Sequence, residues 1–142
     1  MSAFIQRAFV LPVAMLVVMV VAGCDAAIND LPTTPTPVLV TDTLTGEVNI
    51  NGSATNIFFT GATGTVVATL TALGDNPPSK VGFSMGTMSG STCTVVLRND
   101  TAVVTSVITG TVTTLSGSLC ISVYDVGALT ETVPYTVTVT HP

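Results

Sequence analysis

The stretch Val133-Pro134-Tyr135-Thr136-Val137-Thr138-Val139-Thr140 decides the fold, because apolar residues and threonines alternate along it from Tyr135 onward. Successive side chains of a strand point to opposite faces of its sheet, so this alternation predicts a strand with one buried face. We expect Tyr135, Val137 and Val139 to point into a core and the threonines to point outward.

Upstream of this stretch, short runs rich in β-branched and aromatic residues are separated by turn signals. The neighbours Phe58 and Phe59 must point to opposite faces of their strand, so one is expected in the core and the other outside it. Asn99-Asp100 is expected to be the hairpin turn between strands at 93–98 and 101–107.

No window after the N-terminal region shows a helical period. Short β-rich runs spaced by turns predict an all-β fold, a single antiparallel β-sandwich of jelly-roll type over residues 44–142. The chain has 142 residues, which leaves enough for one such domain and not for two.

The chain begins with the pattern of a secretory signal. Met1–Arg7 carries positive charge and no acid, and Ala8–Val21 is apolar apart from Pro12. The next residues complete Val21-Ala22-Gly23-Cys24, which resembles the lipobox of bacterial lipoproteins, with valine where leucine is commonest. Residues 1–23 are therefore predicted to be a lipoprotein signal peptide.

This resemblance implies cleavage between Gly23 and Cys24, a diacylglyceryl group on the Cys24 thiol and an acyl chain on its new amine. Membrane lipid is then one partner, and the bacterial cell envelope is the location. Two alternatives stay open: release after ordinary signal cleavage, or an uncleaved span, which needs about 20 apolar residues where this run is shorter. Residues 24–43, with spaced prolines, are predicted to be a flexible extended linker.

The charge of the chain excludes one class of partner. Its 3 basic and 8 acidic side chains give a formal net charge of −5. Once Arg7 is removed, the basic residues are Lys80 and Arg98, too few for the phosphate contacts that nucleic acid needs. An anionic lipid surface would not attract this domain either, so membrane association is expected to depend on the acyl chains.

Two cysteines remain when Cys24 is assigned to lipid. Cys93 and Cys120 are an even pair in an exported protein, which predicts a disulfide. A metal site is the alternative, but these cysteines and His141 lack a fourth ligand, and neither cysteine belongs to a CxxC pair. We expect no metal and no cofactor.

Four segments carry a resemblance to a known family: Gly46-Glu47-Val48, Phe59 ahead of Gly64-Thr65-Val66, Gly117–Tyr124 and Tyr135–Val139. They are similar to strands of the bacterial pre-peptidase C-terminal domain, a compact β-sandwich appended to secreted enzymes. The chain departs from the family in its middle strand, which lacks Asp-rich and aromatic positions, and in Cys120, which replaces a common aromatic residue. Calcium binding and collagen-type recognition, known for some members, are therefore not carried over.

No catalytic site is expected. The single histidine, His141, is the penultimate residue. Chain ends fray, so we expect an exposed or capping imidazole and not the base of a Ser-His-Asp set. Asp75 and Asn76 offer oxygens for a weak calcium site, but calcium takes six or more oxygen ligands, so an ordinary loop is the expectation. The chain is predicted not to be an enzyme.

Two surface expectations remain. Tyr124 and Tyr135 are expected in the core, which, with no tryptophan in the chain, counts against a carbohydrate module. Val95-Val96 and similar pairs place valines on both faces of their strands, so some should be exposed.

The overall prediction is a non-catalytic envelope lipoprotein. Its sandwich is expected to be a binding or accessory module for an unidentified envelope or extracellular protein. The alternative is a structural subunit that assembles with itself through strand edges or exposed valine faces.

Overall fold

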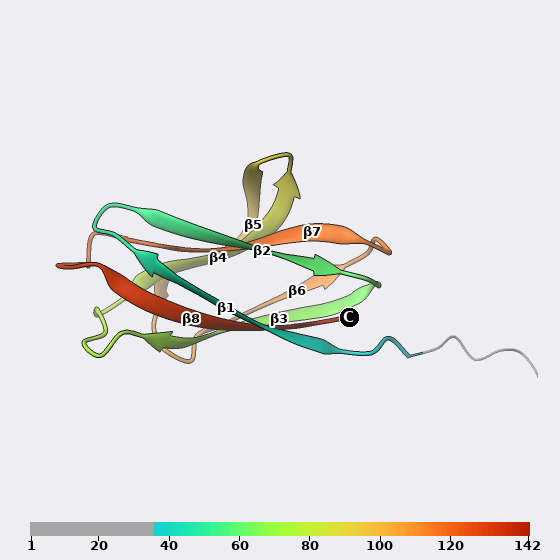
Figure 1. The fold of residues 1–142 in the computed structure, drawn as a ribbon, viewed down its shortest axis with the longest axis horizontal. Helices are drawn as coiled ribbons and strands as arrows, with labels where there is room; N and C mark the ends of the chain where they lie inside the picture. Colours follow the sequence, from blue (N-terminus) through green and yellow to red (C-terminus); the bar gives the residue numbers. More distant parts are fainter. Residues whose placement is uncertain (1–35) are drawn as a thin grey trace, which may run out of the picture. The chain divides into compact units, whose positions relative to one another are not determined.

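Two four-stranded antiparallel sheets pack face to face in the computed structural model, which describes residues 36–142 (Figure 1). The strands are β1 (Val40–Val48), β2 (Ser53–Thr60), β3 (Gly64–Leu73), β4 (Val81–Ser89), β5 (Thr92–Ala102), β6 (Val107–Val112), β7 (Gly117–Tyr124) and β8 (Val133–His141). Their order is β1-β8-β3-β6 in one sheet and β2-β7-β4-β5 in the other. This is the order of a jelly roll, and it confirms the predicted all-β sandwich.

The strand pairs are nested along the chain. β1 pairs with β8, β2 with β7, β3 with β6 and β4 with β5, all antiparallel. The first and last strands of the domain are therefore neighbours, and the tightest hairpin, β4–β5, lies in the middle of the sequence.

The core lies between the two sheets and follows the predicted alternation. Val137 and Val139 of β8 are fully buried, and Tyr135 is 3% exposed. Phe58 of β2 is 2% exposed, whereas its neighbour Phe59 is 68% exposed. One phenylalanine thus lies in the core and the other does not, because successive side chains of a strand point to opposite faces of the sheet.

The domain begins earlier than residue 44. Val40–Thr43 belong to β1, because they continue its ladder with β8, in which Val40 is the partner of His141. The predicted signal peptide, the acylated Cys24 and the linker up to residue 35 lie outside the described residues. Over residues 36–142 the chain forms no helix long and apolar enough to cross a membrane.

The predicted hairpin turn at Asn99-Asp100 is wrong. β5 runs through both residues, and the chain turns later, around Thr105, whose φ is 79°. Asn99 acts locally instead, since its side-chain oxygen accepts hydrogen bonds from the backbone N–H and the hydroxyl of Thr101. The register between β4 and β5 shifts here, which places a bulge in β5 where a turn was expected.

Asp125, just after β7, holds two loops together. Its Oδ2 accepts a hydrogen bond from the N–H of Asn51 at 2.8 Å, and its Oδ1 accepts from Gly127, Ala128 and Leu129 at 2.7, 2.9 and 3.2 Å. The Asn51 N–H contributes most to holding the pKa of this carboxyl below its ordinary value, and the three other N–H groups add to it. The charged form is thereby stabilised and the β1–β2 turn is fixed to the β7–β8 loop.

Candidate functional site

The β4–β5 hairpin rises from the outer face of its sheet (Figure 1). Gly86 of β4 lies under the returning strand: a Cβ built on it would be 2.1 Å from the carbonyl oxygen of Thr94 and 2.9 Å from Cα of Val95. Both contacts are with backbone, so only glycine permits β5 to pass this closely. The hairpin therefore forms a wall on one side of the sheet.

The predicted disulfide fastens this wall. Cys93, at the start of β5, is bonded to Cys120 of β7, and their Cα atoms are 6.0 Å apart. β4 lies between these two strands in the sheet, and the register partner of Cys120 on β4 is Gly86. Since Gly86 has no side chain, the bond can cross the outer face of β4 at this point.

A cleft of about 490 Å³ opens between the hairpin and the sheet, which lies within the usual size range of small-molecule sites. The sheet contributes five side chains to its lining: Ser53, Thr55, Ser84, Ser122 and Tyr124. The hairpin contributes five more: Ser91, Thr92, Cys93, Val95 and Arg98. The lining is thus rich in hydroxyl groups and has a single charged residue.

A row of side chains across the sheet forms the floor of the cleft. Thr55, Ser122, Ser84 and Arg98 are successive register partners on β2, β7, β4 and β5. The Oγ1 of Thr55 and the Oγ of Ser122 are hydrogen-bonded at 2.7 Å. Ser84, in the middle of this row, has a hydroxyl without a hydrogen-bond partner among the described residues.

Ser84 is 1% exposed, and within residues 36–142 its Oγ is the buried side-chain oxygen or nitrogen without a hydrogen-bond partner. Leaving a buried hydroxyl unpaired costs about 1–3 kcal/mol, so native proteins seldom keep one without a reason. This oxygen is itself buried, so a ligand group in the cleft would provide the missing partner once a covering side chain moves aside. This hydroxyl is therefore the strongest indication that the cleft is a site.

Tyr124 is not a core residue, contrary to the prediction. It lies on the outer face of β7, where its ring covers Gly82: Cε2, Cδ2 and Cζ would be 2.0, 2.3 and 2.3 Å from a Cβ there. Its hydroxyl donates to the Asp100 carboxylate, which also faces the Nε of Arg98 at 3.6 Å. Burial, followed by the hydrogen bond to Asp100, raises the pKa of Tyr124 to about 12, so the phenol remains a donor at neutral pH.

The sequence did contain a signal for this site in β4. Gly82, Ser84 and Gly86 occupy its outer face, while Phe83 and Met85, 0% and 5% exposed, point into the core. A half-buried strand usually carries larger polar side chains on its outer face. Three small residues in alternate positions indicate that something packs closely over that face, and here it is the Tyr124 ring and the β5 backbone.

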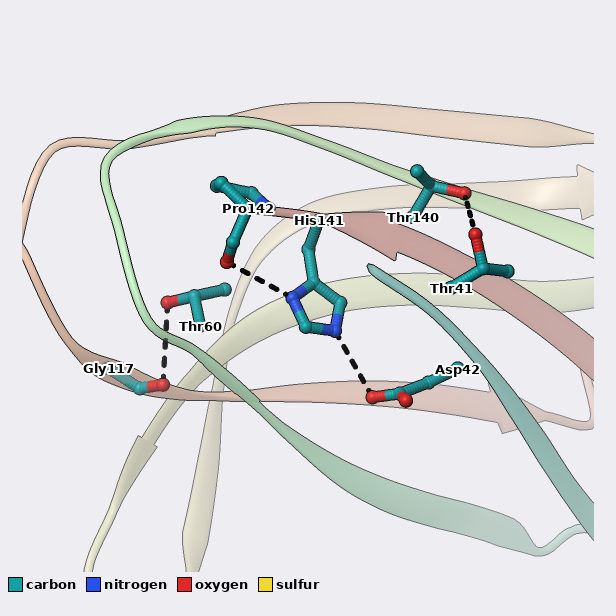
Figure 2. A network of polar contacts seen from close by, with 7 residues as sticks. All are labelled: Thr41, Asp42, Thr60, Gly117, Thr140, His141 and Pro142. Carbon is teal, nitrogen blue, oxygen red and sulfur yellow. Dashed lines mark hydrogen bonds and ion pairs between the residues drawn. The ribbon is translucent and has the colours of Figure 1, made fainter. Parts of the chain in front are cut away.

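His141 is buried, so the prediction of an exposed or capping imidazole is wrong. It is 4% exposed, and its Nε2 lies 3.1 Å from Oδ2 of Asp42 (Figure 2). Its ring centroid is 5.3 Å from that of Phe58. His141 does not fray although it is the penultimate residue, because β1 extends to Val40, which is the register partner of His141 on the neighbouring strand.

The geometry around His141 is that of a structural contact. Figure 2 shows both ring nitrogens engaged, one by Asp42 and the other by the Pro142 carbonyl at 3.3 Å. The nearby Thr60 hydroxyl donates to the carbonyl of Gly117 at 3.5 Å. Among the described residues no hydroxyl is bonded to the imidazole, so this network joins β1 to the end of β8 and does not form a Ser-His-Asp arrangement. Across residues 36–142 no three His, Cys, Asp or Glu side chains are grouped so as to hold a metal ion.

Apolar side chains are exposed beside the cleft. Phe59 is 68% exposed and Ile57 is 48% exposed on β2, and Val95 and Val96 of β5 are 48% and 66% exposed. Ile57, Cys120, Gly86 and Val95 are successive register partners, so Ile57 and Val95 lie on the same row of the sheet. The expectation of exposed valines is confirmed for this pair.

No family model matches the chain, and no curated protein matches it. The resemblance to the pre-peptidase C-terminal domain therefore stays a prediction that is based on short segments. The observations that bear on function are therefore the geometry of the cleft and the N-terminal sequence.

Proposed function

We propose that this protein is a non-catalytic lipoprotein of the bacterial cell envelope, anchored through acylated Cys24, which displays a jelly-roll sandwich as a binding module. The observation that carries the binding role is the unpaired, buried Ser84 hydroxyl at the floor of the cleft. The anchor is supported by the lipobox-like Val21-Ala22-Gly23-Cys24 after an apolar run. Two or three acyl chains hold a protein at a membrane far better than one.

The cleft, and not the His141 contact, is the binding site of this module. The cleft is open to solvent and bounded by a wall that a disulfide fixes. A wall fixed before the ligand arrives reduces the entropy that binding would otherwise cost. At His141, by contrast, both ring nitrogens already have partners within the domain.

Cys24→Ser is expected to release the protein from membranes. Serine cannot accept the thioether-linked lipid, so the acyl chains that contribute about 0.8 kcal/mol per buried CH₂ are lost. The measurement is the distribution of the protein between the membrane and soluble fractions of bacteria that export it, after a high-salt, alkaline wash.

Gly23→Ala is the matched control, because alanine is also common at this place in a lipobox, and this variant should stay with the membrane. A Cys24→Ser protein that still sediments with washed membranes would contradict the anchor. So would wild-type protein found mainly in the soluble fraction.

We propose a structural subunit as the second candidate, supported by the exposed Ile57, Phe59, Val95 and Val96. Exposed apolar side chains on a sparsely charged protein favour self-association where they gather on one face. Sedimentation of the full chain in detergent decides between the two: a species that stays monomeric at high concentration rejects assembly. Assembly that Phe59→Ser abolishes would support it.

A further inference from the structure

Ser84 lies at the centre of the cleft floor, and its hydroxyl needs a partner that can donate or accept. The hydroxyls of Thr55 and Ser122 are bonded to each other, and neither of them is hydrogen-bonded to Ser84. We propose that the cleft binds one sugar unit of a neutral saccharide, with a sugar hydroxyl bonded to Ser84 Oγ. This inference rests on the proposed function, since it names the ligand of the same binding module.

The lining matches the hydrogen-bonding chemistry of a polyol. Ser53, Ser91 and Thr92 also face the cleft, from the sheet and from the hairpin. A hydroxyl side chain both donates and accepts and can rotate to do either, as a sugar hydroxyl can. Such a cleft can form several hydrogen bonds with a polyol without leaving a buried charge unpaired.

The charges around the cleft disfavour ionic ligands. Arg98 is the single charged residue of the lining, and its Nε already faces the Asp100 carboxylate at 3.6 Å. The net charge favours a cationic ligand at long range, but inside the cleft such a ligand would lie against the Arg98 guanidinium, and no acidic side chain among the described residues belongs to the lining. An anionic ligand would approach a chain whose formal net charge is −5 and would compete with Asp100 for the guanidinium. A neutral ligand meets neither penalty.

Tyr124 provides an apolar surface for a sugar ring. One face of its ring lies on Gly82, so the opposite face is turned away from the sheet. The residue lines the cleft, and its hydroxyl is fixed by donation to Asp100. Aromatic rings present large flat apolar faces, to which the C–H face of a pyranose is complementary. The expectation that both tyrosines serve the core had counted against a saccharide ligand, and the position of Tyr124 removes that objection.

The test is a titration of the full chain, labelled with ¹⁵N and purified in a detergent without a sugar headgroup. Maltose, cellobiose and N,N′-diacetylchitobiose are the probes, and galacturonate is the anionic comparison. We expect at least one neutral disaccharide to shift the amide signals of Ser84, Ser122 and Tyr124. Galacturonate should shift them less at the same concentration.

Ser84→Ala should weaken binding of the active disaccharide by about tenfold, because it removes one hydrogen bond at the cleft floor. The same change removes an unpaired buried hydroxyl, so its unfolding midpoint should stay the same or rise. Weaker binding would therefore not reflect unfolding. Ser118→Ala is the matched control, because Ser118 lies on β7 of the same sheet but does not line the cleft, and the affinity of this variant should be unchanged.

Cleft amides that none of the neutral disaccharides shifts would overturn the inference, as would a Ser84→Ala protein that binds as tightly as wild type. Preferential binding of galacturonate would also overturn it in favour of an anion. If saccharides fail while Cys24→Ser still abolishes membrane association, the ligand class is wrong and the anchored module stands. If saccharides bind and the anchor test fails, the ligand class stands and the membrane location is wrong.

Discussion

Replacement of both Cys93 and Cys120 by alanine is expected to lower the free energy of unfolding by about 3.5 kcal/mol. The bond closes a loop with a sequence separation of 27 residues, and a cross-link of this length removes much of the conformational freedom of the unfolded chain. Alanine is preferred to serine because Cys120 is 0% exposed, and serine would bury a new hydroxyl there. Urea denaturation of the wild-type and double-variant proteins measures the difference.

Reduction of the wild-type protein provides the control, because it breaks the same bond without removing atoms. Wild type in reducing agent should resemble the double variant, and reducing agent should not affect the double variant. A loss of stability below about 1 kcal/mol in both experiments would show that the cross-link contributes little to the fold. Hydrogen exchange at the start of β5 should become faster, because the hairpin wall would have lost its attachment to β7.

Gly86→Ala is expected to destabilise the domain by about 3 kcal/mol or more. The added methyl group would lie 2.1 Å from the Thr94 carbonyl oxygen and 2.9 Å from Cα of Val95, so the β5 backbone must move. Movement of β5 at this point also strains the disulfide next to it. The measurement is the urea midpoint of the variant compared with that of wild type.

Substitutions at two other glycines provide comparisons for the effect of Gly86→Ala. Gly61→Ala adds a methyl group with no atom within 4 Å and should change stability by less than about 0.5 kcal/mol. Gly82→Ala displaces the Tyr124 ring and no backbone, so it should be milder than Gly86→Ala and should disturb the cleft. Equal effects of the substitutions at 86 and 61 would mean that β5 does not cross β4 as described.

The sandwich was predictable where one face of a strand is covered by the opposite sheet. In β8 the alternation of Tyr135, Val137 and Val139 with threonine states which face is buried, because a strand has a period of two. The disulfide was predicted from the two cysteines that remain when Cys24 is assigned to lipid, in a chain that carries the pattern of a secretory signal. Neither inference required knowledge of which strands are neighbours.

The errors arose where distant residues determine a local conformation. Asn99-Asp100 has the composition of a turn, but Asp100 is bound by Tyr124 of β7 and the chain turns at Thr105 instead. The N–H of Thr105 donates to the carbonyl of Leu70 at 2.7 Å, and no local sequence pattern predicts this contact. His141 was expected to fray because its partners, Asp42 and Phe58, are remote in sequence.

The cleft was missed for the same reason. Parity alone places Ser84 and Tyr124 on the outer face, but it does not say that a hairpin returns over that face and encloses them. The small residues of β4 indicate close packing, although they do not identify what packs there. Which residues share the cleft depends on the pairing of β2, β7, β4 and β5.

The position of β1 has a mechanical consequence. Its first residue, Val40, is paired with His141, and the nine residues of β1 all have register partners on β8. A pull on the chain ahead of Val40, directed along β1, would load these pairs in shear, so that they share the force. A pull across the sheet would open them one after another, which needs much less force. The direction of the pulling force thus determines whether the β1–β8 pairs resist it together or separate one after another.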